Sequence, residues 1–384
     1  MQRARFVKQI NTLFKVHPIV ALLGPRQCGK TTLAKHYIQL KNGKLPQENY
    51  FDLENVTDLA RLASPHMALE SLKGLIVVDE IQRRPDLFPA LRVLADHKSK
   101  SQRYLILGSA SRDLIRQSSE TLAGRIGYME LTPFSYPETK HIQKLWVRGG
   151  FPRAYLAKDD GRSQIWREDY IQTFLERDIP NLGIQVPPRQ LRRFWMMLAH
   201  YHGNLFNASE IGRALGINYK TVQHYLDILT GTFMIRELPP WFENISKRQV
   251  KASKIYFRDS GVLHSLLGIS SYSALLTSPK IGASWEGFAL EEIIRLHQAK
   301  VEECYFWATH GEAELDLLII KNGKRLGFEF KYTDAPKMTK SMVVAQEYLG
   351  LDQLTIIYPG KHRFPVGRNI HAIGLERYMV DFLL

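Results

Sequence analysis

The chain has 384 residues, of which 45% are hydrophobic and 23% charged, which favours a globular protein of about two to three domains and excludes a disordered or fibrous chain. Its 52 Lys and Arg residues against 38 Asp and Glu give a net charge of +14, which favours an anionic partner such as nucleic acid, the alternative being solvated basic faces. Two cysteines, Cys28 and Cys304, exclude a disulfide framework. Because we find no secretory signal and no apolar run of about 18 residues, we expect a cytoplasmic protein with no membrane contact.

The first predicted elements are a strand, a loop and a helix. The apolar run 18–23 predicts a buried strand, and 32–38 predicts a helix. The octapeptide between them fits G-x-x-x-x-G-K-[ST], whose backbone N–H groups surround the phosphates of a nucleotide. We expect Lys30 to reach the β- and γ-phosphates and Thr31 to ligate Mg²⁺. The predicted nucleotide-binding residues are Gly24, Pro25, Arg26, Gln27, Cys28, Gly29, Lys30, Thr31 and Thr32.

Two further strands end in polar residues. The run 74–78 is followed by Asp79 and Glu80, a Walker B pattern in which Asp79 holds the magnesium ion and Glu80 orients the attacking water. The strand 104–109 ends in Ser109, which we expect to contact the γ-phosphate or that water. Carboxyl ends of parallel strands meet at one edge of a sheet, so these side chains should converge. The alternative is a buried strand that ends in a polar turn.

An arginine follows the third strand after a short turn. Arg125 is the candidate arginine finger, acting in cis or from a neighbouring subunit, and Arg112 is the reserve. The alternative for Arg125 is a structural salt bridge.

These motifs, taken in order, resemble one group of bacterial and archaeal proteins. The matching segments after the phosphate loop are 79–85, 107–111, 122–125, 149–152 and 175–179. The chain is similar to AAA-type P-loop ATPases that carry a C-terminal domain of unknown function of the DUF4143 type. The resemblance spans nearly the whole chain and implies ATP hydrolysis by an AAA-type core, without fixing the biological task.

The middle of the chain predicts a DNA-reading unit. A helix over 208–215, a turn at 216–218 and a second helix over 219–229 form a helix–turn–helix, and 233–238 and 254–257 predict the strands of a wing. A regulatory or protein-binding role is the alternative. The predicted DNA-binding residues are Lys220, Thr221, Gln223 and His224. Basic neighbours are Arg189, Arg192, Arg193, Lys247, Arg248, Lys251 and Lys254.

Acidic residues recur along the last third of the chain. The stretch 285–294 is amphipathic and carries Glu286, and the run 301–307 predicts a strand. The next strand, 313–320, carries Asp316 among apolar residues. A hairpin turn leads to 327–331, where Glu329 and Lys331 are two apart and therefore share a face.

This order of acids and lysine resembles the PD-(D/E)XK nuclease fold. The resemblance implies that Asp316 and Glu329 bind Mg²⁺, that Lys331 positions the water, and that Glu286 is the helix carboxylate, with Glu292 as the alternative. The leading proline of that motif is absent. The alternatives are binding of DNA or a protein without cleavage, or a simple salt bridge between Lys331 and a carboxylate.

The predicted fold class is α/β, built of a parallel-sheet core, a helical lid, a winged helix and an α/β nuclease-like domain. The predicted boundaries are 1–140 for the ATPase core, 141–186 for the helical lid or connector, 187–262 for the winged helix and 263–384 for the nuclease-like domain. We expect Mg²⁺-dependent ATP hydrolysis coupled to binding or remodelling of DNA, with a Holliday junction as a possible substrate, in a homo-oligomer that can be a ring. The alternatives are a slow ATP-dependent regulatory switch that binds a partner protein, and a defence-type ATPase–nuclease.

Overall fold

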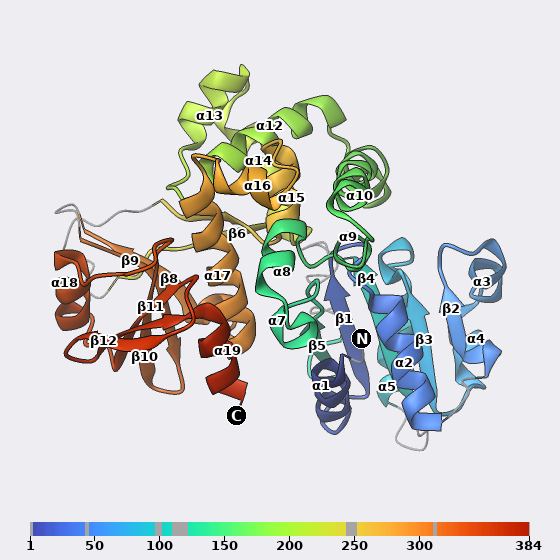
Figure 1. Ribbon diagram of the computed structural model, residues 1–384. Coiled ribbons are helices and arrows are strands. Elements are labelled where there is room, and N and C mark those ends of the chain that lie inside the picture. Colours follow the sequence, from blue (N-terminus) through green and yellow to red (C-terminus); the bar gives the residue numbers. More distant parts are fainter. Residues whose placement is uncertain are drawn as a thin grey trace. The chain divides into compact units, whose positions relative to one another are not determined.

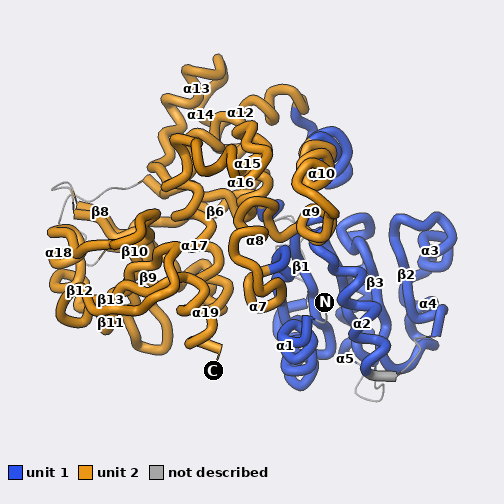
Figure 2. Tube along the Cα trace, in the orientation of Figure 1, with its two compact units in different colours: residues 1–134, 172–186, 231–233 blue, residues 135–171, 187–230, 234–384 orange. Residues whose placement is uncertain are grey.

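The computed structural model describes residues 3–42, 46–96, 102–109, 122–242, 252–309 and 313–383. The chain divides into two compact units, which Figure 2 colours separately. Unit 1 comprises Met1–Phe134, Gln172–Val186 and Gly231–Phe233, and unit 2 comprises Ser135–Ile171, Pro187–Thr230 and Met234–Leu384. Residues 141–186, predicted as one connector, therefore contribute to both units. Within the described ranges, every helix is too short or too polar to cross a bilayer.

Unit 1 is built on a five-stranded parallel sheet with the order β2-β3-β4-β1-β5 (Figure 1). Because every pair is parallel, all five strands end at the same edge of the sheet. The parallel-sheet α/β core expected from the sequence is therefore confirmed. The strands are β1 (Ile19–Gly24), β2 (Tyr50–Asp52), β3 (Leu75–Asp79), β4 (Arg103–Ser109) and β5 (Ile126–Glu130).

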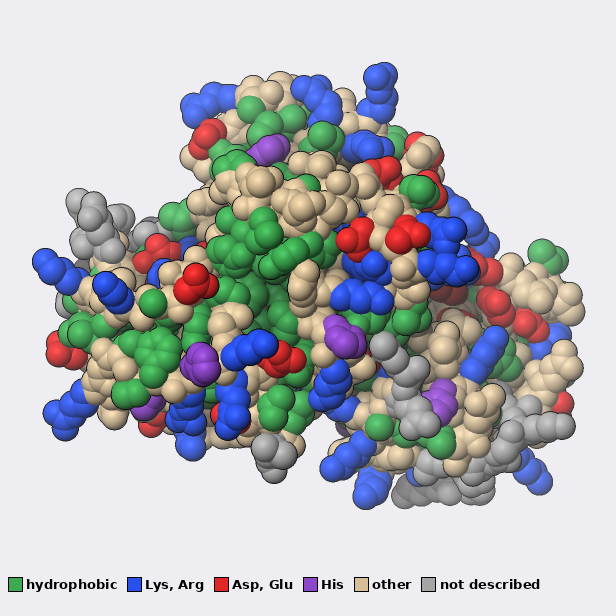
Figure 3. Space-filling model, in the orientation of Figure 1, with side chains coloured by type: hydrophobic (Ala, Val, Ile, Leu, Met, Phe, Trp, Pro, Cys, Tyr) green, Lys and Arg blue, Asp and Glu red, His purple; other side chains and the backbone are tan. Residues whose placement is uncertain are grey.

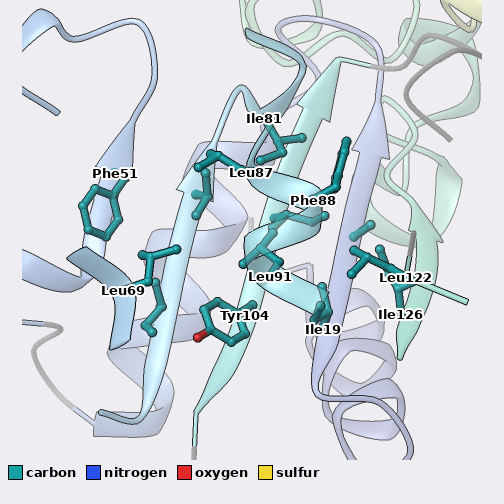
Figure 4. Packing of buried hydrophobic residues seen from close by; sticks show 14 of the residues in the cluster. Ile19, Phe51, Leu69, Ile81, Leu87, Phe88, Leu91, Tyr104, Leu122 and Ile126 are labelled. Atoms are coloured by element: carbon teal, nitrogen blue, oxygen red, sulfur yellow. The ribbon is translucent and has the colours of Figure 1, made fainter. Parts of the chain in front are cut away.

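Helices cover both faces of this sheet because the side chains of each strand alternate between the faces. On β1, Val20 and Leu22 pack toward α1 (Ala4–Phe14) and α2 (Lys30–Asn42). On the other face, Ile19 and its neighbours pack against α5 (Leu87–Asp96), as Figure 4 shows. The smaller helical elements of unit 1 are η1 (Gln47–Asn49), α3 (Val56–Arg61), α4 (Pro65–Glu70), η2 (Ile81–Arg83), η3 (Phe174–Asp178) and α11 (Ile179–Asn181).

Unit 2 begins with helices and continues into an antiparallel strand pair. The second helix of the predicted helix–turn–helix is α14, and β6 pairs with β7 in antiparallel register. The elements are α7 (Tyr136–Thr139), α8 (Ile142–Arg148), α9 (Pro152–Tyr155), α10 (Asp160–Thr173), α12 (Pro188–Tyr201), α13 (Ala208–Leu215), α14 (Tyr219–Gly231), β6 (Ile235–Leu238), β7 (Lys254–Phe257), α15 (Ser260–Leu266), α16 (Tyr272–Leu276) and α17 (Ile281–His297).

The rest of unit 2 is a β-rich domain around a six-stranded mixed sheet with the order β12-β13-β11-β10-β9-β8. The central strands β10, β11 and β13 are parallel to one another, whereas β8, β9 and β12 are antiparallel to their neighbours. The elements are β8 (Cys304–Ala308), β9 (Glu314–Lys321), β10 (Lys324–Phe330), α18 (Lys340–Tyr348), β11 (Gln353–Tyr358), β12 (Arg363–Gly367), β13 (Ile370–Gly374) and α19 (Leu375–Leu383).

The strand predicted over 301–307 begins later than expected. Residues Val301–Glu303 form a 3-10 turn, η4, and β8 starts at Cys304. The backbone N–H of Lys300 donates to Oε2 of Glu303 at 2.8 Å. This local hydrogen bond stabilises a turn where the apolar pattern alone predicted extended backbone.

Candidate functional site

The phosphate loop connects β1 to α2 at the carboxyl edge of the unit 1 sheet. A Cβ atom on Gly24 would lie 2.2 Å from the carbonyl oxygen of Leu131, so only glycine fits there. Gly29 has φ 99°, which glycine adopts without a steric penalty. The guanidinium of Arg3 donates to the carbonyl oxygen of Cys28 at 3.0 Å and holds the centre of the loop. Glycine at these two positions therefore lets the loop backbone adopt its tight turn.

Lys30 is buried at the start of α2, and its ammonium group folds over the loop. Nζ donates to the carbonyl oxygens of Gly24 at 2.9 Å and Pro25 at 3.0 Å, and to Oγ of Ser109 at 3.2 Å. The structure therefore brings together the loop lysine and the serine at the end of β4.

Asp79 ends β3 with its carboxylate buried beside the first turn of α2. Its Oδ2 accepts hydrogen bonds from Oγ1 of Thr31 at 2.7 Å and from Oη of Tyr50 at 2.8 Å. Burial raises the pKa of Asp79, and these two donors oppose that rise because they favour the ionised form. Burial and the nearby Asp79 carboxylate raise the pKa of Tyr50. Tyr50 is thus a member of the site that the sequence reasoning missed.

Glu80 follows in a left-handed conformation, with φ 58° and ψ 45°. This conformation costs roughly 1–2 kcal/mol for a residue with a side chain, and such strain is typical of functional sites. Oε2 of Glu80 accepts hydrogen bonds from Oγ of Ser109 at 3.3 Å and from Nε2 of Gln82. The turn therefore directs the Glu80 carboxylate to the serine that also contacts Lys30.

Arg26, in the middle of the loop, forms two ion pairs. Its guanidinium lies 2.9 Å from Oε1 of Glu54 and 3.2 Å from Oδ1 of Asp178, at the end of η3. Burial raises the pKa of Asp178, and Arg26 opposes the rise. Pro25, Ser109 and Asp178 line a small cavity beside the loop.

The donor set suits a magnesium nucleotide, which the P-loop fold implies. The Thr31 hydroxyl and the Asp79 carboxylate are neighbouring oxygen donors, and Mg²⁺ prefers oxygen ligands. The Lys30 ammonium is bonded to neutral carbonyl oxygens, so a phosphate oxygen would be a stronger acceptor for it.

Arg125 does not reach the phosphate loop of its own chain. Its guanidinium forms a two-pronged ion pair with Asp96, at 2.5 and 2.8 Å. The carbonyl oxygen of Arg125 accepts a hydrogen bond from the N–H of Ile19, the first residue of β1. Gly24 is the last residue of β1, and the phosphate loop continues from it. The two sites are therefore at opposite edges of the sheet, and action from a neighbouring subunit stays a prediction. Arg112 lies outside the described residues.

The acids predicted in the last third of the chain converge in unit 2. Glu286 comes from α17, Asp316 from β9 and Glu329 from β10. Oε1 of Glu286 and Oδ1 of Asp316 lie 3.8 and 3.7 Å from Nζ of Lys254, at the start of β7. Oη of Tyr256 donates to Oε1 of Glu286 at 2.6 Å. We call this group the carboxylate cluster. Its members are Glu286, Glu314, Asp316, Glu329, Lys254, Lys331 and Tyr256.

Burial raises the pKa of two acids of the carboxylate cluster. Burial, followed by the Asp316 charge, raises the pKa of Glu286 to about 7 and that of Glu329 to about 8. Nζ of Lys331 lies 2.7 Å from Oε1 of Glu329, while Oε2 of Glu329 is buried without a hydrogen-bond partner among the described residues.

Lys254 is the unexpected member of the carboxylate cluster. It was grouped with the basic residues around the helix–turn–helix, but it is 6% exposed and also contacts Glu314. Burial alone would lower the pKa of Lys254, but Asp316 and the two glutamates raise it above its ordinary value. In the described part of the chain, no group of three or more His, Cys, Asp or Glu side chains is arranged to hold a metal ion. Within the cluster, the ammonium groups of Lys254 and Lys331 contact the carboxylates.

Glu292 takes no part in this cluster. Its Oε2 accepts from the backbone N–H of Tyr136 at 2.7 Å, and its Oε1 accepts from Arg295 at 3.1 Å. Glu286 is therefore the α17 residue that joins Asp316 and Glu329.

The predicted DNA-binding residues lie on α14. Lys220 and His224 are exposed and Thr221 and Gln223 are half-buried, whereas Val222 and the other apolar residues of α14 are buried. The N–H of Thr221 donates to Oδ1 of Asn218, which caps the start of the helix. The basic residues at 247, 248 and 251 lie outside the described residues.

Comparison with known proteins places these sites in a family. One family model, described as an AAA domain, matches residues 16–140, and another, a domain of unknown function (DUF4143), matches 281–378. A third domain of unknown function (DUF8612) matches 139–273. The uncharacterised proteins Mb2031c of Mycobacterium bovis and Rv2008c of Mycobacterium tuberculosis are each 47% identical over 373 residues, which cover 96% of this chain and 83% of theirs.

The chain belongs to this family of AAA–DUF4143 P-loop ATPases. Among solved structures, the Walker-type ATPase paby2304 of Pyrococcus abyssi is 15% identical with a TM-score of 0.45, over 69% of this chain and 95% of that one.

Three site residues of this AAA–DUF4143 chain had a weak sequence signal or none. Tyr50 lies on β2, two residues before Asp52, and Asp52 aligns with Asp79 in the β2–β3 register. Only this strand order reveals that Tyr50 and Asp79 are neighbours. Asp178 lies in the segment 175–179 that carried part of the family resemblance. Lys254 had no signal, because nothing in its own strand indicates a buried carboxylate partner.

Proposed function

We propose that this AAA–DUF4143 protein is a Mg²⁺-dependent ATPase that works on DNA. The proposal rests on one observation: Lys30, Ser109 and Glu80 are hydrogen-bonded in series, beside the pair formed by Thr31 and Asp79. Lys30 and Thr31 begin α2, Asp79 and Ser109 end β3 and β4, and Glu80 directly follows β3, so all five lie at the carboxyl edge of one parallel sheet. This is the arrangement that phosphoryl transfer needs, since its catalysis is chiefly positioning and charge stabilisation.

Each residue then has a separate role in ATP hydrolysis. Lys30 exchanges its carbonyl partners for the β- and γ-phosphates. Thr31 and Asp79 hold the magnesium ion, which supplies neutralisation of phosphate charge. Glu80 accepts a proton from the attacking water or orients it, and Ser109 lies between Glu80 and Lys30 to contact the γ-phosphate.

The proposed DNA-binding element is a winged helix formed by α12, α13, α14, β6 and β7. Lys220 and His224 are exposed on α14, and Arg192 and Arg193 are exposed on α12. These four basic side chains support contacts with phosphates or base edges. Contacts of this kind make binding fall steeply as the salt concentration rises.

The test is the ATP turnover rate of the full chain without DNA, with duplex DNA and with a four-way junction. Stimulation by DNA supports a motor or remodelling activity, and stronger stimulation by the junction supports branched substrates. The proposed assembly is a homo-oligomer in which Arg125 completes a neighbour's site. A monomer with a slow rate that DNA leaves unchanged would instead favour the regulatory switch.

The second candidate function is phosphodiester cleavage at the carboxylate cluster, with Asp316 and Glu329 as Mg²⁺ ligands. It is supported by the convergence of these acids with Lys331 and by the unpartnered Oε2 of Glu329. Against it, the Lys254 ammonium already contacts Asp316, so a metal ion would have to displace it.

Replacing Lys254 tests this candidate. Lys254→Met leaves Glu286 and Asp316 without their cation, which we expect to destabilise unit 2 by about 3–5 kcal/mol. If the cluster can hold a metal ion, Mn²⁺ should raise the melting temperature of this variant more than that of the wild type. Metal-dependent cleavage that Lys331→Ala abolishes would support a nuclease, and an equal Mn²⁺ effect on both proteins would refute a metal site.

A further inference from the structure

A cavity of about 680 Å³ in unit 2 lies at the carboxyl ends of three parallel strands. Tyr332 follows β10, Lys361 follows β11 and Glu376 follows β13, and all three line it. Residues of α8 and α17 also line it. The carboxyl ends of parallel strands are the usual place for ligands in open α/β sheets, and this volume lies in the range of ligand pockets.

The lining of this cavity carries an excess of positive charge. Lys140, Lys144 and Lys361 line it, and among the described residues none of the three has an ion pair or a side-chain hydrogen bond. Arg148 also lines it, paired with Asp160 at 2.6 Å. Burial, and then the Arg148 charge, lowers the pKa of Lys144. An anionic ligand would relieve this repulsion.

Aromatic side chains line the same cavity. The ring of Trp146 lies 5.3 Å from that of Trp285 and 5.6 Å from that of Tyr332, and its Nε1 donates to Oγ of Ser284. The tryptophans are buried, whereas Tyr332 and Tyr272 are half-buried. Figure 3 shows exposed hydrophobic side chains over α16 and α17 with Lys and Arg side chains beside them. Both tryptophans thus pack against Tyr332, whose half-buried ring can stack on a planar ligand.

We propose that this cavity binds a nucleotide unit, with its base against the tyrosines and its phosphate on Lys144 and Lys361. A free inorganic anion would use only the lysines, whereas a base attached to a phosphate uses both parts of the lining. Aromatic stacking next to basic side chains is the recognition mode of single-stranded nucleic acid. The unit can be a free mononucleotide or part of such a strand.

The cavity and the carboxylate cluster share two structural elements. Trp285 and Glu286 are consecutive on α17, and Lys331 and Tyr332 are consecutive after β10. In each pair one residue belongs to the cluster and the other lines the cavity. A nucleic-acid strand bound in the cavity would therefore pass close to the carboxylate cluster. Binding in the cavity requires neither cleavage nor ATP hydrolysis.

The test measures binding of a fluorescein-labelled oligothymidylate, about twelve nucleotides long, to the full chain by anisotropy over a range of NaCl concentrations. Lys361→Ala should weaken binding and reduce the slope of log affinity against log salt by about 1. Tyr332→Leu should weaken it by about fivefold or more, and Tyr332→Phe, which keeps the ring, should not. Competition by thymidine monophosphate would show that a free nucleotide suffices, and its absence would assign the cavity to a strand.

Matched controls separate this site from the others. Lys324 is exposed at the opposite end of β10, so Lys324→Ala should leave affinity and salt slope unchanged. Lys30→Ala should bind the strand as wild type does, which keeps the result independent of the ATPase proposal. The inference is overturned if Lys361→Ala and Tyr332→Leu bind like wild type, if Lys324→Ala loses as much as they do, or if only Lys220→Ala weakens binding.

Discussion

The hydroxyl of Thr31 donates a 2.7 Å hydrogen bond to Oδ2 of Asp79, and this bond joins the first turn of α2 to the end of β3. Tyr50 donates to the same oxygen, so two hydroxyl groups hold one buried carboxylate. Asp79 is 3% exposed, and an unpaired carboxylate would be costly there. The contact thus places both predicted magnesium ligands side by side.

Removing the Thr31 hydroxyl should weaken Mg²⁺ binding at the site. Thr31→Val keeps the shape of the side chain but loses both the predicted ligand and the bond to Asp79. We expect the Mg²⁺ concentration needed for half-maximal ATP binding to rise by about 10- to 100-fold, measured with a fluorescent ATP analogue. Thr57→Val, on the exposed face of α3, is the control and should behave like wild type. An unchanged Mg²⁺ requirement in Thr31→Val would contradict this role.

The pairing of Arg125 with Asp96 allows a matched test of the arginine finger. Arg125→Ala and Asp96→Ala break the same ion pair, so a purely structural bridge predicts similar small effects. If Arg125 acts on a neighbour's nucleotide, only Arg125→Ala should lower ATP turnover, by about a thousandfold or more. ATP turnover at saturating ATP distinguishes the structural salt bridge from the arginine finger. An equal loss of turnover in both variants would show that Arg125 has a structural role.

Gly287 on α17 should not tolerate a side chain. A Cβ atom there would lie 2.1 Å from Nε2 of the buried His202, whereas one on Gly282 of the same helix would meet nothing within 4 Å. We expect Gly287→Ala to lower the free energy of unfolding by about 1–3 kcal/mol. Gly282→Ala should raise it by about 0.5–1 kcal/mol because alanine favours helix. Urea unfolding measures both, and equal values for the two variants would refute this account of the packing.

Glu292 should make the stability of unit 2 depend on pH. Burial raises its pKa from 4.5 to about 7, so between these values the unfolded chain is ionised while the folded one keeps its proton. Stability is then fully present below pH 4.5 and falls as the pH rises to about 7, by about 3 kcal/mol. Glu292→Gln should flatten this decline in urea unfolding at pH 5, 6 and 8. Parallel profiles for the two proteins would show that Glu292 is ionised when folded.

The sequence predicted those features that depend on local pattern. The phosphate loop, the strand ends at Asp79 and Ser109, and the helix that carries Lys220 follow from apolar periodicity and short motifs, which are properties of neighbouring residues. The exposed face of α14 could be predicted for the same reason, because Val222 and its helical neighbours define the buried face.

The remaining features depend on which distant segments become neighbours. Tyr50 meets Asp79 only because β2 lies beside β3, and Lys254 meets Asp316 although 62 positions separate them in the sequence, as their numbers show. The position of Arg125 at the amino edge of the sheet follows from the parallel pairing of β5 with β1. Strand order and register are not encoded in any single motif, so sequence patterns alone could not place these residues.

ATP turnover and ATP affinity of Glu80→Gln, compared with wild type and Lys30→Ala in the presence of Mg²⁺, test the central claim most directly. The account predicts that Glu80→Gln binds ATP as tightly as wild type but turns it over about 100-fold or more slowly, and that Lys30→Ala loses binding. Wild-type turnover in both variants would contradict the assignment of this loop and carboxylate as an ATPase site.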